Sequence, residues 1–161
     1  MAITTVDRSP ASDDVRSPSV LAVLITRDAA GWLRESLRSL AEQTHPRLGV
    51  VAVDNGSTDG TAELLQQALG EGRVIALGEN RRIAGALRVA TELPAAQAAD
   101  YLLVVHDDAA LAPDAVARLV EAAEGIEGVE RVGVVGPKIV DWDDPRVLRE
   151  VGRSTDRKSV V

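Results

Sequence analysis

Two adjacent carboxylates follow an apolar segment in this 161-residue chain, in the stretch YLLVVHDD. Leu102 to Val105 predict a buried strand, and His106, Asp107 and Asp108 come directly after it. Neighbouring carboxylates repel one another unless a positive group or water lies against them. Mg²⁺ and Mn²⁺ prefer oxygen ligands, and Mg²⁺ typically binds one or two carboxylates together with substrate phosphates. The stretch is therefore either a metal and diphosphate site or a solvated turn whose carboxylates bond nearby backbone amides.

Polar residues also follow three other apolar segments. Several residues at these four segment ends have both a structural and a functional interpretation. Asp54, after GVVAV, can accept hydrogen bonds from a nucleobase or ribose, or form a turn with its own backbone. His106 can bind a ligand oxygen or a metal, or be satisfied by a backbone carbonyl. Arg81 and Arg82 can neutralise a diphosphate or pair with surface acids. The residues that follow the four segments are Thr26-Arg27-Asp28, Asp54-Asn55, Glu79-Asn80 and His106-Asp107-Asp108.

Apolar strand patterns alternate with helical patterns between residues 19 and 152. Strands are expected at VLAVLI, GVVAV, RVIALG, YLLVV and RVGVVGPKIV, and the helix over IAGALRVATEL is expected to stop at Pro94. Residues 1–18, rich in Ser, Thr, Asp and Pro, and residues 153–161 are expected to be tails. This order predicts an α/β domain with a mostly parallel sheet flanked by helices. Ligands of such sheets lie outside the carboxyl ends of the strands, where the polar residues gather.

Composition narrows the classes of function. The formal net charge of −7 argues against nucleic acid as the main partner, because phosphate backbones are bound by surplus Lys and Arg. The chain has no cysteine, no apolar run long enough for a membrane helix and no signal-peptide pattern, so we expect a cytoplasmic protein. A small anionic ligand fits a locally positive or metal-bearing pocket.

Several known motifs are missing from the sequence. There is no GxxxxGK[ST] loop, no GxGxxG after the first strand and no GxSxG elbow. These absences argue against three classes of enzyme: P-loop enzymes, dinucleotide oxidoreductases and α/β-hydrolases. A sugar-nucleotide pyrophosphorylase would need a glycine-rich basic loop after the first strand, where TRDAAGWL offers one glycine.

Five segments together resemble the nucleotide-binding half of a family 2 glycosyltransferase with the GT-A fold, a Rossmann-like sheet. The resemblance covers about residues 20–152 and lies in the order of the family's motifs. VVAVDNGSTDGT is the most recognisable segment, and LLVVHDDAALAPDAVARL matches the DxD strand. The other segments are VLITRDAAGWLRESLRSLAEQTHP, LGENRRIAGALRVA and VGVVGPKIV.

The resemblance implies transfer of a sugar from a nucleoside-diphosphate sugar to an acceptor hydroxyl on a glycan, lipid or other molecule, with Mg²⁺ or Mn²⁺. His106 occupies the first position of the DxD motif and Asp108 the last, which implies that Asp108 holds the metal, with Asp107 between them. The other residues that it implies for donor binding are Thr26 and Asp28 near the base, Asp54 at the base or ribose, Asn55 and Arg82.

The sequence departs from the family at several positions. Arg82 stands where the family usually has glycine, and Arg88 where it often has asparagine. Family domains continue past GPKIV into an acceptor-binding half that supplies the catalytic base, so the fold is expected to be truncated here and no base is named. The alternative is therefore a non-catalytic nucleotide-binding module. Membrane contact is expected only through segments absent from this chain, and the sequence is compatible with a homo-oligomer.

Overall fold

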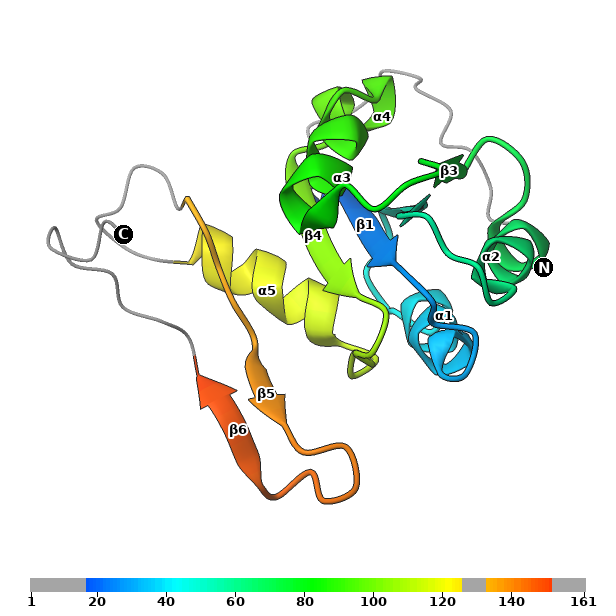
Figure 1. The fold of residues 1–161 in the computed structure, drawn as a ribbon. Helices are drawn as coiled ribbons and strands as arrows, with labels where there is room; N and C mark the ends of the chain where they lie inside the picture. The colour runs from blue at the N-terminus through cyan, green and yellow to red at the C-terminus, as the bar shows by residue number, and fades with distance from the viewer. Residues whose placement is uncertain (1–16, 126–132, 152–161) are drawn as a thin grey trace, which may run out of the picture.

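A computed structural model describes residues 17–125 and 133–151 of the chain. Most of the two expected tails, residues 1–18 and 153–161, lies outside the described residues. Four parallel strands form the central sheet in the order β3-β2-β1-β4 (Figure 1). Their bounds are Val20–Thr26 for β1, Leu48–Asp54 for β2, Val74–Ala76 for β3 and Tyr101–His106 for β4. The predicted α/β class with a mostly parallel sheet is confirmed.

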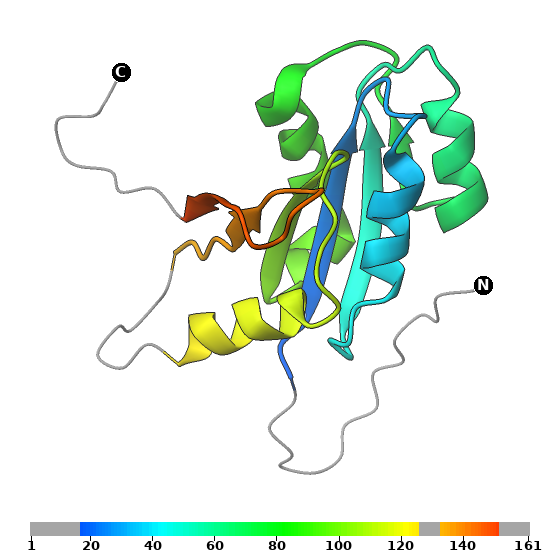
Figure 2. The same cartoon turned by 90° about the horizontal axis from the view of Figure 1, so that it is seen from below.

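Helices cover both faces of this sheet (Figure 2). Helices α1 (Leu33–Ala41) and α2 (Thr61–Leu69) pack on one face, where Leu24 and Leu33 are fully buried. Helix α3 (Arg82–Thr91) packs on the other face, where Val23 and Val53 meet Ala86 and Ala90. All seven residues of β1 are buried, as expected of a central strand covered on both faces.

Strand β4 is less buried than the sequence predicts. It lies at the edge of the sheet, and its side chains point alternately to the two faces. Val105 is 4% exposed, whereas Leu102 and Val104 are 41% and 43% exposed. The expected buried strand is therefore only half covered in the described structure. The sequence could not predict this, because an apolar run does not show its place in the sheet.

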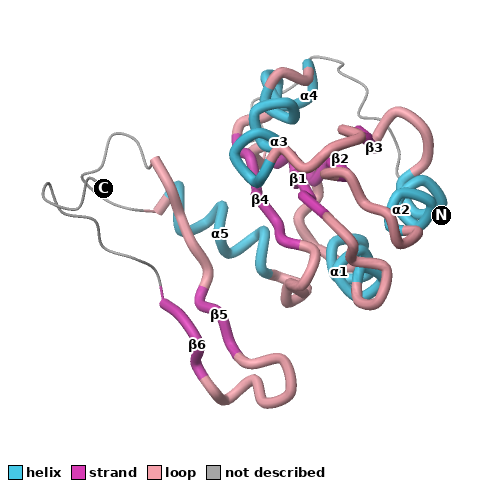
Figure 3. The backbone as a smooth tube through the Cα atoms, viewed as in Figure 1, coloured by secondary structure: helices cyan, strands magenta, loops and turns pink. Residues whose placement is uncertain are grey.

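The expected fifth strand does not join the parallel sheet. Residues 133–137 of RVGVVGPKIV are not in a strand, and Lys138–Val140 form β5. This strand pairs antiparallel with β6 (Leu148–Val151) in a separate two-stranded sheet (Figure 3). The turn between them contains Asp141 to Asp144, the segment DWDD.

One helix boundary also differs from expectation. Helix α3 ends at Thr91, and Pro94 begins the short helix α4 (Pro94–Ala98) instead of only stopping the preceding helix. Proline fits the first turn of a helix because its missing N–H has no partner there anyway. Helix α5 (Ala115–Glu124) begins two residues after Pro113. Among the described residues, no helix combines the length and apolar character needed to cross a bilayer.

The strand register brings the polar ends together. Thr26 of β1 lies beside Asp54 of β2, and Ile25 lies beside His106 of β4. Because the strands are parallel, the loops after β1, β2, β3 and β4 all leave from the same edge. The sheet therefore gathers residues from four distant parts of the chain at one rim.

Candidate functional site

A cleft of about 510 Å³ opens at the carboxyl edge of the sheet. It lies within the size range of small-molecule binding sites. Residues from the ends of β1, β2 and β4 and from the start of α3 form its walls. They are Ile25, Thr26, Arg27, Asn55, Asn80, Arg82, Ile83, Ala84, His106 and Asp107.

The cleft has a basic lining in an acidic protein. Arg27 and Arg82 line it together with a single carboxylate, that of Asp107, although the chain carries a net charge of −7. The Arg27 guanidinium lies 3.6 Å from the Asp28 carboxylate, with both side chains substantially exposed. Within the described part of the chain, we find no acidic partner for the Arg82 side chain. Two guanidiniums at one cleft favour an anionic ligand.

The adjacent arginines behave differently. Arg81 forms an ion pair with Glu79 at 3.3 Å and does not line the cleft. The expectation that surface acids neutralise this basic pair therefore holds for Arg81 alone. Arg82 keeps its charge available beside the cleft.

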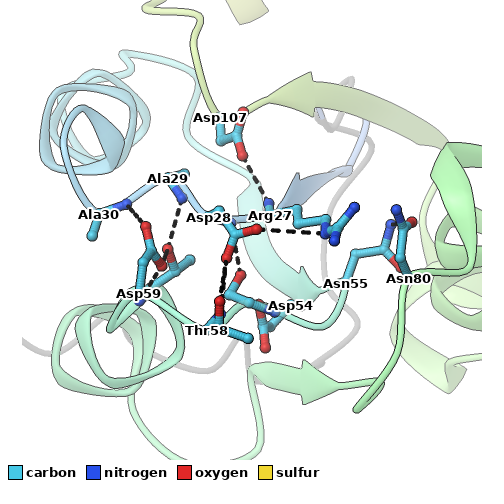
Figure 4. Close-up of polar contacts among 12 residues, drawn as sticks. Arg27, Asp28, Ala29, Ala30, Asp54, Asn55, Thr58, Asp59, Asn80 and Asp107 are labelled. Atoms are coloured by element: carbon cyan, nitrogen blue, oxygen red, sulfur yellow. Dashed lines mark hydrogen bonds and ion pairs between the residues drawn. The ribbon is translucent and has the colours of Figure 1, made fainter.

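The loop after β1 is held by side chains from two other loops (Figure 4). Four consecutive backbone N–H groups, from Arg27 to Ala30, each donate to a side-chain oxygen. The acceptors, in order, are Asp107 Oδ2 at 2.9 Å, Ser57 Oγ at 3.0 Å, Thr61 Oγ1 at 2.8 Å and Asp59 Oδ2 at 3.0 Å. These bonds connect the loop after β1 with those after β2 and β4, which fixes one wall of the cleft.

Two predicted ligand-binding carboxylates take part in this network. Asp28 Oδ1 accepts hydrogen bonds from the backbone N–H of Thr58 at 2.8 Å and from its hydroxyl at 3.3 Å, and Asp28 does not line the cleft. Asp107 lines the cleft, but its Oδ2 is bonded to Arg27 and its carbonyl oxygen accepts from Ser36 Oγ at 2.6 Å. Both residues thus connect loops, and the Asp107 Oδ1 atom faces no recorded donor within the described residues.

Asp59 is the acidic centre of the network. Hydrogen bonds from the Thr61 hydroxyl and from the Ala30 backbone hold the pKa of its carboxyl below the usual value. A group whose folded pKa is depressed stabilises the fold above its unfolded pKa, and this contribution is lost as the pH falls through the folded pKa.

We therefore expect Asp59→Asn to reduce stability near neutral pH and to matter progressively less at acidic pH. The measurement is the free energy of unfolding in urea from about pH 6 to about pH 2 for both proteins. The difference between them should shrink as the pH falls below the unfolded pKa of aspartate. A difference that is constant across the range would show that the charge on Asp59 does not stabilise the network.

Asp54 and Asn55, at the end of β2, have different surroundings. Asp54 is 4% exposed, its Oδ1 accepts from the Ser57 backbone N–H at 3.2 Å, and it does not line the cleft. Asn55 lines the cleft and connects it to the next loop, because its Oδ1 accepts from the Arg81 N–H at 2.8 Å and its Nδ2 donates to Asn80 Oδ1 at 3.1 Å. The bond from Ser57 to Asp54 forms the turn that was one of the two interpretations of this residue in the sequence.

Thr26 carries a buried hydroxyl without a partner. The residue is 1% exposed, and its Oγ1 makes no hydrogen bond within the described structure. An unpaired buried polar group is destabilising, so native structures rarely contain one without a functional or structural reason. Thr26 lies among the residues that line the cleft.

The end of β4 provides oxygen and nitrogen ligands but no complete metal centre. His106 is exposed and lines the cleft, and Asp108 is exposed just beyond it. In residues 17–125 and 133–151 no three His, Asp or Glu side chains converge as a metal site would require. The Asp108 carboxylate has no recorded partner among those residues, and the second oxygen of Asp107 is likewise available. Two carboxylates suit Mg²⁺ or Mn²⁺ when a ligand supplies further oxygens.

The sequence matches the family model described as glycosyl transferase family 2 over residues 21–156. The chain belongs to this family. A curated relative from Mycobacterium tuberculosis, N-acetylglucosaminyl-diphospho-decaprenol L-rhamnosyltransferase, is 30% identical over 129 residues. The match covers 75% of this chain and 41% of the relative, so the chain spans less than half of the relative's length.

Solved glycosyltransferase structures share the fold. The mannosyltransferase PcManGT from Pyrobaculum calidifontis, in complex with GDP-Man and Mn²⁺, gives a TM-score of 0.59 at 28% identity. That comparison covers 69% of this chain and 34% of the mannosyltransferase. S. aureus TarS 1–349 in complex with UDP-GlcNAc gives a TM-score of 0.54 at 20% identity, covering 76% of this chain and 40% of TarS, which supports the fold alone. The predicted GT-A fold of this family 2 chain is confirmed.

In this family 2 chain the cleft collects five of the eight predicted site residues: Thr26, Asn55, Arg82, His106 and Asp107. Asp28, Asp54 and Asp108 lie outside its lining. Arg27 and Asn80 line the cleft and were missing from the predicted site, although both belong to the polar segments at the strand ends. Their position in those segments could have indicated them, because Arg27 is adjacent to Asp28 and Asn80 is adjacent to Arg81.

Proposed function

We propose that this chain binds a nucleoside-diphosphate sugar and belongs to an enzyme that transfers the sugar to an acceptor hydroxyl. The observation that carries the proposal is the cleft at the carboxyl edge of the sheet, where Arg27 and Arg82 meet residues from three strand ends. Family membership and the basic lining support a phosphorylated ligand over a neutral one. A related mannosyltransferase structure contains GDP-Man and Mn²⁺.

Within the proposal, residues divide into ligand contacts and supports. Thr26, Asn55, Arg82 and His106 contact the donor, and Asp107 reaches it through the cation, which binds the oxygen that the Arg27 amide leaves unused. Asp54 binds the base or ribose through Oδ2, because the bond from the Ser57 N–H uses only Oδ1. Asp28 supports the site by fixing the loop at Thr58, which makes its proposed contact near the base an indirect one.

A divalent cation completes the proposed donor site. Asp108 and the second oxygen of Asp107 would hold Mg²⁺ or Mn²⁺, with the remaining ligands from the diphosphate and water. The cation would offset the negative charge that develops on the leaving diphosphate. In the transfer, the acceptor oxygen bonds to the anomeric carbon, the bond from that carbon to the diphosphate oxygen breaks, and the nucleoside diphosphate leaves with the electron pair. A base takes the hydroxyl proton.

Titration with UDP, GDP and dTDP, with and without Mn²⁺, tests the proposal. We expect one of them to bind in the presence of Mn²⁺, and saturation at about 100 times Kd to stabilise the fold by about 2.7 kcal/mol. Asp108→Ala should weaken the Mn²⁺-dependent binding about tenfold or more while leaving the unfolding free energy unchanged. Asp143→Ala, at an exposed residue in the β5–β6 turn, is the matched control and should bind normally. Nucleotide binding that is equal in all three proteins would remove Asp108 from the site.

A second candidate is a module that binds the donor without transferring the sugar. Asp107 is the only carboxylate that lines the described cleft, and one of its oxygens is already bonded to Arg27. Once the other oxygen of Asp107 binds the proposed cation, no carboxylate lining the described cleft remains to deprotonate an acceptor. Detection of sugar transfer or steady donor hydrolysis by this chain would exclude the module.

A further inference from the structure

Arg82 has an unusual backbone conformation for its residue type. Its φ is +58°, in the left-handed region, where Cβ lies too close to the backbone carbonyl oxygen. Of the described residues other than glycine, only Asp28 shares a positive φ, at +50°, and aspartate tolerates this region far better than arginine does. Such strain persists only where surrounding structure enforces it, and it gathers at functional sites.

Two asparagine side chains enforce this conformation. Asn80 Oδ1 accepts a hydrogen bond from the Arg82 backbone N–H at 2.8 Å, and Asn55 Oδ1 accepts from the Arg81 N–H at 2.8 Å. The two amides also bond each other, because Asn55 Nδ2 donates to Asn80 Oδ1 at 3.1 Å. The Asn80 oxygen thus uses both of its acceptor positions. The backbone amides of Arg81 and Arg82, at the start of α3, are thus fixed by two asparagine side chains that also bond each other.

The base of this pair is rigid. Asn55 is 4% exposed and follows β2, and its backbone N–H donates to the Thr26 carbonyl at 2.9 Å. At Gly56, the loop passes so close to Glu79 that an added Cβ would lie 2.7 Å from a backbone carbon. The loops after β2 and β3 are therefore held together immediately before the strained residue.

We infer that Asn55 and Asn80 are positioning residues that hold Arg82 in its left-handed conformation, and that Arg82 binds the diphosphate of the donor. The inference rests on the proposed function for the identity of the ligand. Arg82 lines the cleft and has no acidic partner among the described residues, so its guanidinium is ready to pair with phosphate oxygens. Glycine at this position would remove the strain and also the charge, and an arginine in its place favours a role in binding.

Double-mutant cycles between Asn80 and Arg82 test this inference. The variants are Asn80→Ala, Arg82→Gly and the double variant, with Asn80→Asp as the conservative change that keeps the acceptor oxygen. Arg81→Ala is the matched control, because Arg81 is adjacent but pairs with Glu79 outside the cleft. Each protein is measured without ligand, by its melting temperature, and with Mn²⁺ plus the tightest binder among UDP, GDP and dTDP, by Kd.

Without ligand, Arg82→Gly should raise the melting temperature by a few degrees, because glycine adopts the left-handed conformation freely. Asn80→Ala should lower it by a similar amount, and by clearly less when residue 82 is glycine. Additive shifts, or a lower melting temperature for Arg82→Gly, would overturn the positioning role. This arm needs no nucleotide, so it remains decisive even if no nucleotide binds and the proposed function fails.

With ligand, Arg82→Gly should weaken binding about tenfold or more, as expected for a lost charge-assisted contact. Asn80→Ala should weaken it through Arg82, so the double variant should bind no more weakly than Arg82→Gly alone. Asn80→Asp keeps the acceptor oxygen but adds a negative charge that opposes the diphosphate, so a restored melting temperature, and not a restored affinity, is the result expected of it. Arg81→Ala should change the affinity less than twofold. Multiplicative losses in the double variant would mean that Asn80 acts independently of Arg82.

Competition with inorganic pyrophosphate and with the free nucleoside identifies what Arg82 recognises. If Arg82 binds the diphosphate, Arg82→Gly should weaken pyrophosphate binding and leave nucleoside binding unchanged. The reverse result would assign Arg82 to the base or ribose and overturn the diphosphate contact, while the proposed donor site would stand.

Discussion

Replacing Gly56 by alanine is expected to lower the free energy of unfolding by about 2–5 kcal/mol, the sum of left-handed strain and overpacking. Gly56 has φ +80°, and a Cβ there would lie 2.7 Å from the carbonyl carbon and 2.9 Å from the Cα of Glu79. Backbone atoms cannot move aside as a flexible side chain does. The substitution should therefore separate the loops after β2 and β3 and weaken nucleotide binding as well as stability.

Gly60 provides the matched control for this experiment. Its φ is +91°, but a Cβ there would have no neighbour within 4 Å. Gly60→Ala should therefore cost only the conformational part, about 1–2 kcal/mol. Urea denaturation of both variants measures the difference. Equal losses in the two variants would show that the close approach of Glu79 to Gly56 does not limit stability.

The sheet and its functional rim could be predicted from the sequence because both follow from local patterns. The apolar runs ending at Thr26, Asp54 and His106 are strands, and the order of strands and helices indicates parallel pairing. Parallel pairing then places the strand ends at one edge. Three strand ends and the start of α3 supply residues to the cleft, as this logic requires.

Membership of a sheet could not be predicted from the apolar content of a segment. VGVVGPKIV is as rich in β-branched residues as a buried strand. The strand that it forms in the described structure, Lys138–Val140, nevertheless pairs with Leu148–Val151 in a separate hairpin. The turn DWDDPR lies between these two strands, and Asp141 and Asp144 accept hydrogen bonds from Arg149 and Arg146 across and within it. Local pattern shows that a segment is extended but not which neighbour it pairs with.

The partners of individual carboxylates were equally hidden. Asp28, Asp59 and Asp107 look alike in sequence, as acids beside turns, but each bonds a backbone amide of another loop or turn. That role depends on how close the loops come in three dimensions. The charge on Arg82 was visible in the sequence, whereas its left-handed backbone was signalled only indirectly, by the glycine that the family resemblance implies at this position.

The second large effect is expected at Thr26, where Thr26→Val should raise the free energy of unfolding by about 1–3 kcal/mol. The Thr26 hydroxyl is buried without a partner in the described structure, and the residue is 1% exposed in a central strand. Valine has the same branched shape and suits a strand, so the substitution removes an unsatisfied polar group without leaving a cavity. Denaturation in urea measures this gain, and a loss of stability would mean that the hydroxyl has a partner in solution.

Nucleotide binding should change in the opposite direction. If the Thr26 hydroxyl completes its hydrogen bonding with the donor, Thr26→Val should weaken binding about fivefold to tenfold, the worth of roughly one neutral hydrogen bond. The comparison uses the nucleoside diphosphate that binds wild type most tightly with Mn²⁺. Ala22→Gly, elsewhere in β1, perturbs the strand without touching the cleft lining and serves as the control. A stabilised Thr26→Val protein with unchanged affinity would remove Thr26 from the donor contacts. A gain in stability together with a loss of affinity is instead the pattern of a binding group that is left without a partner until its ligand binds.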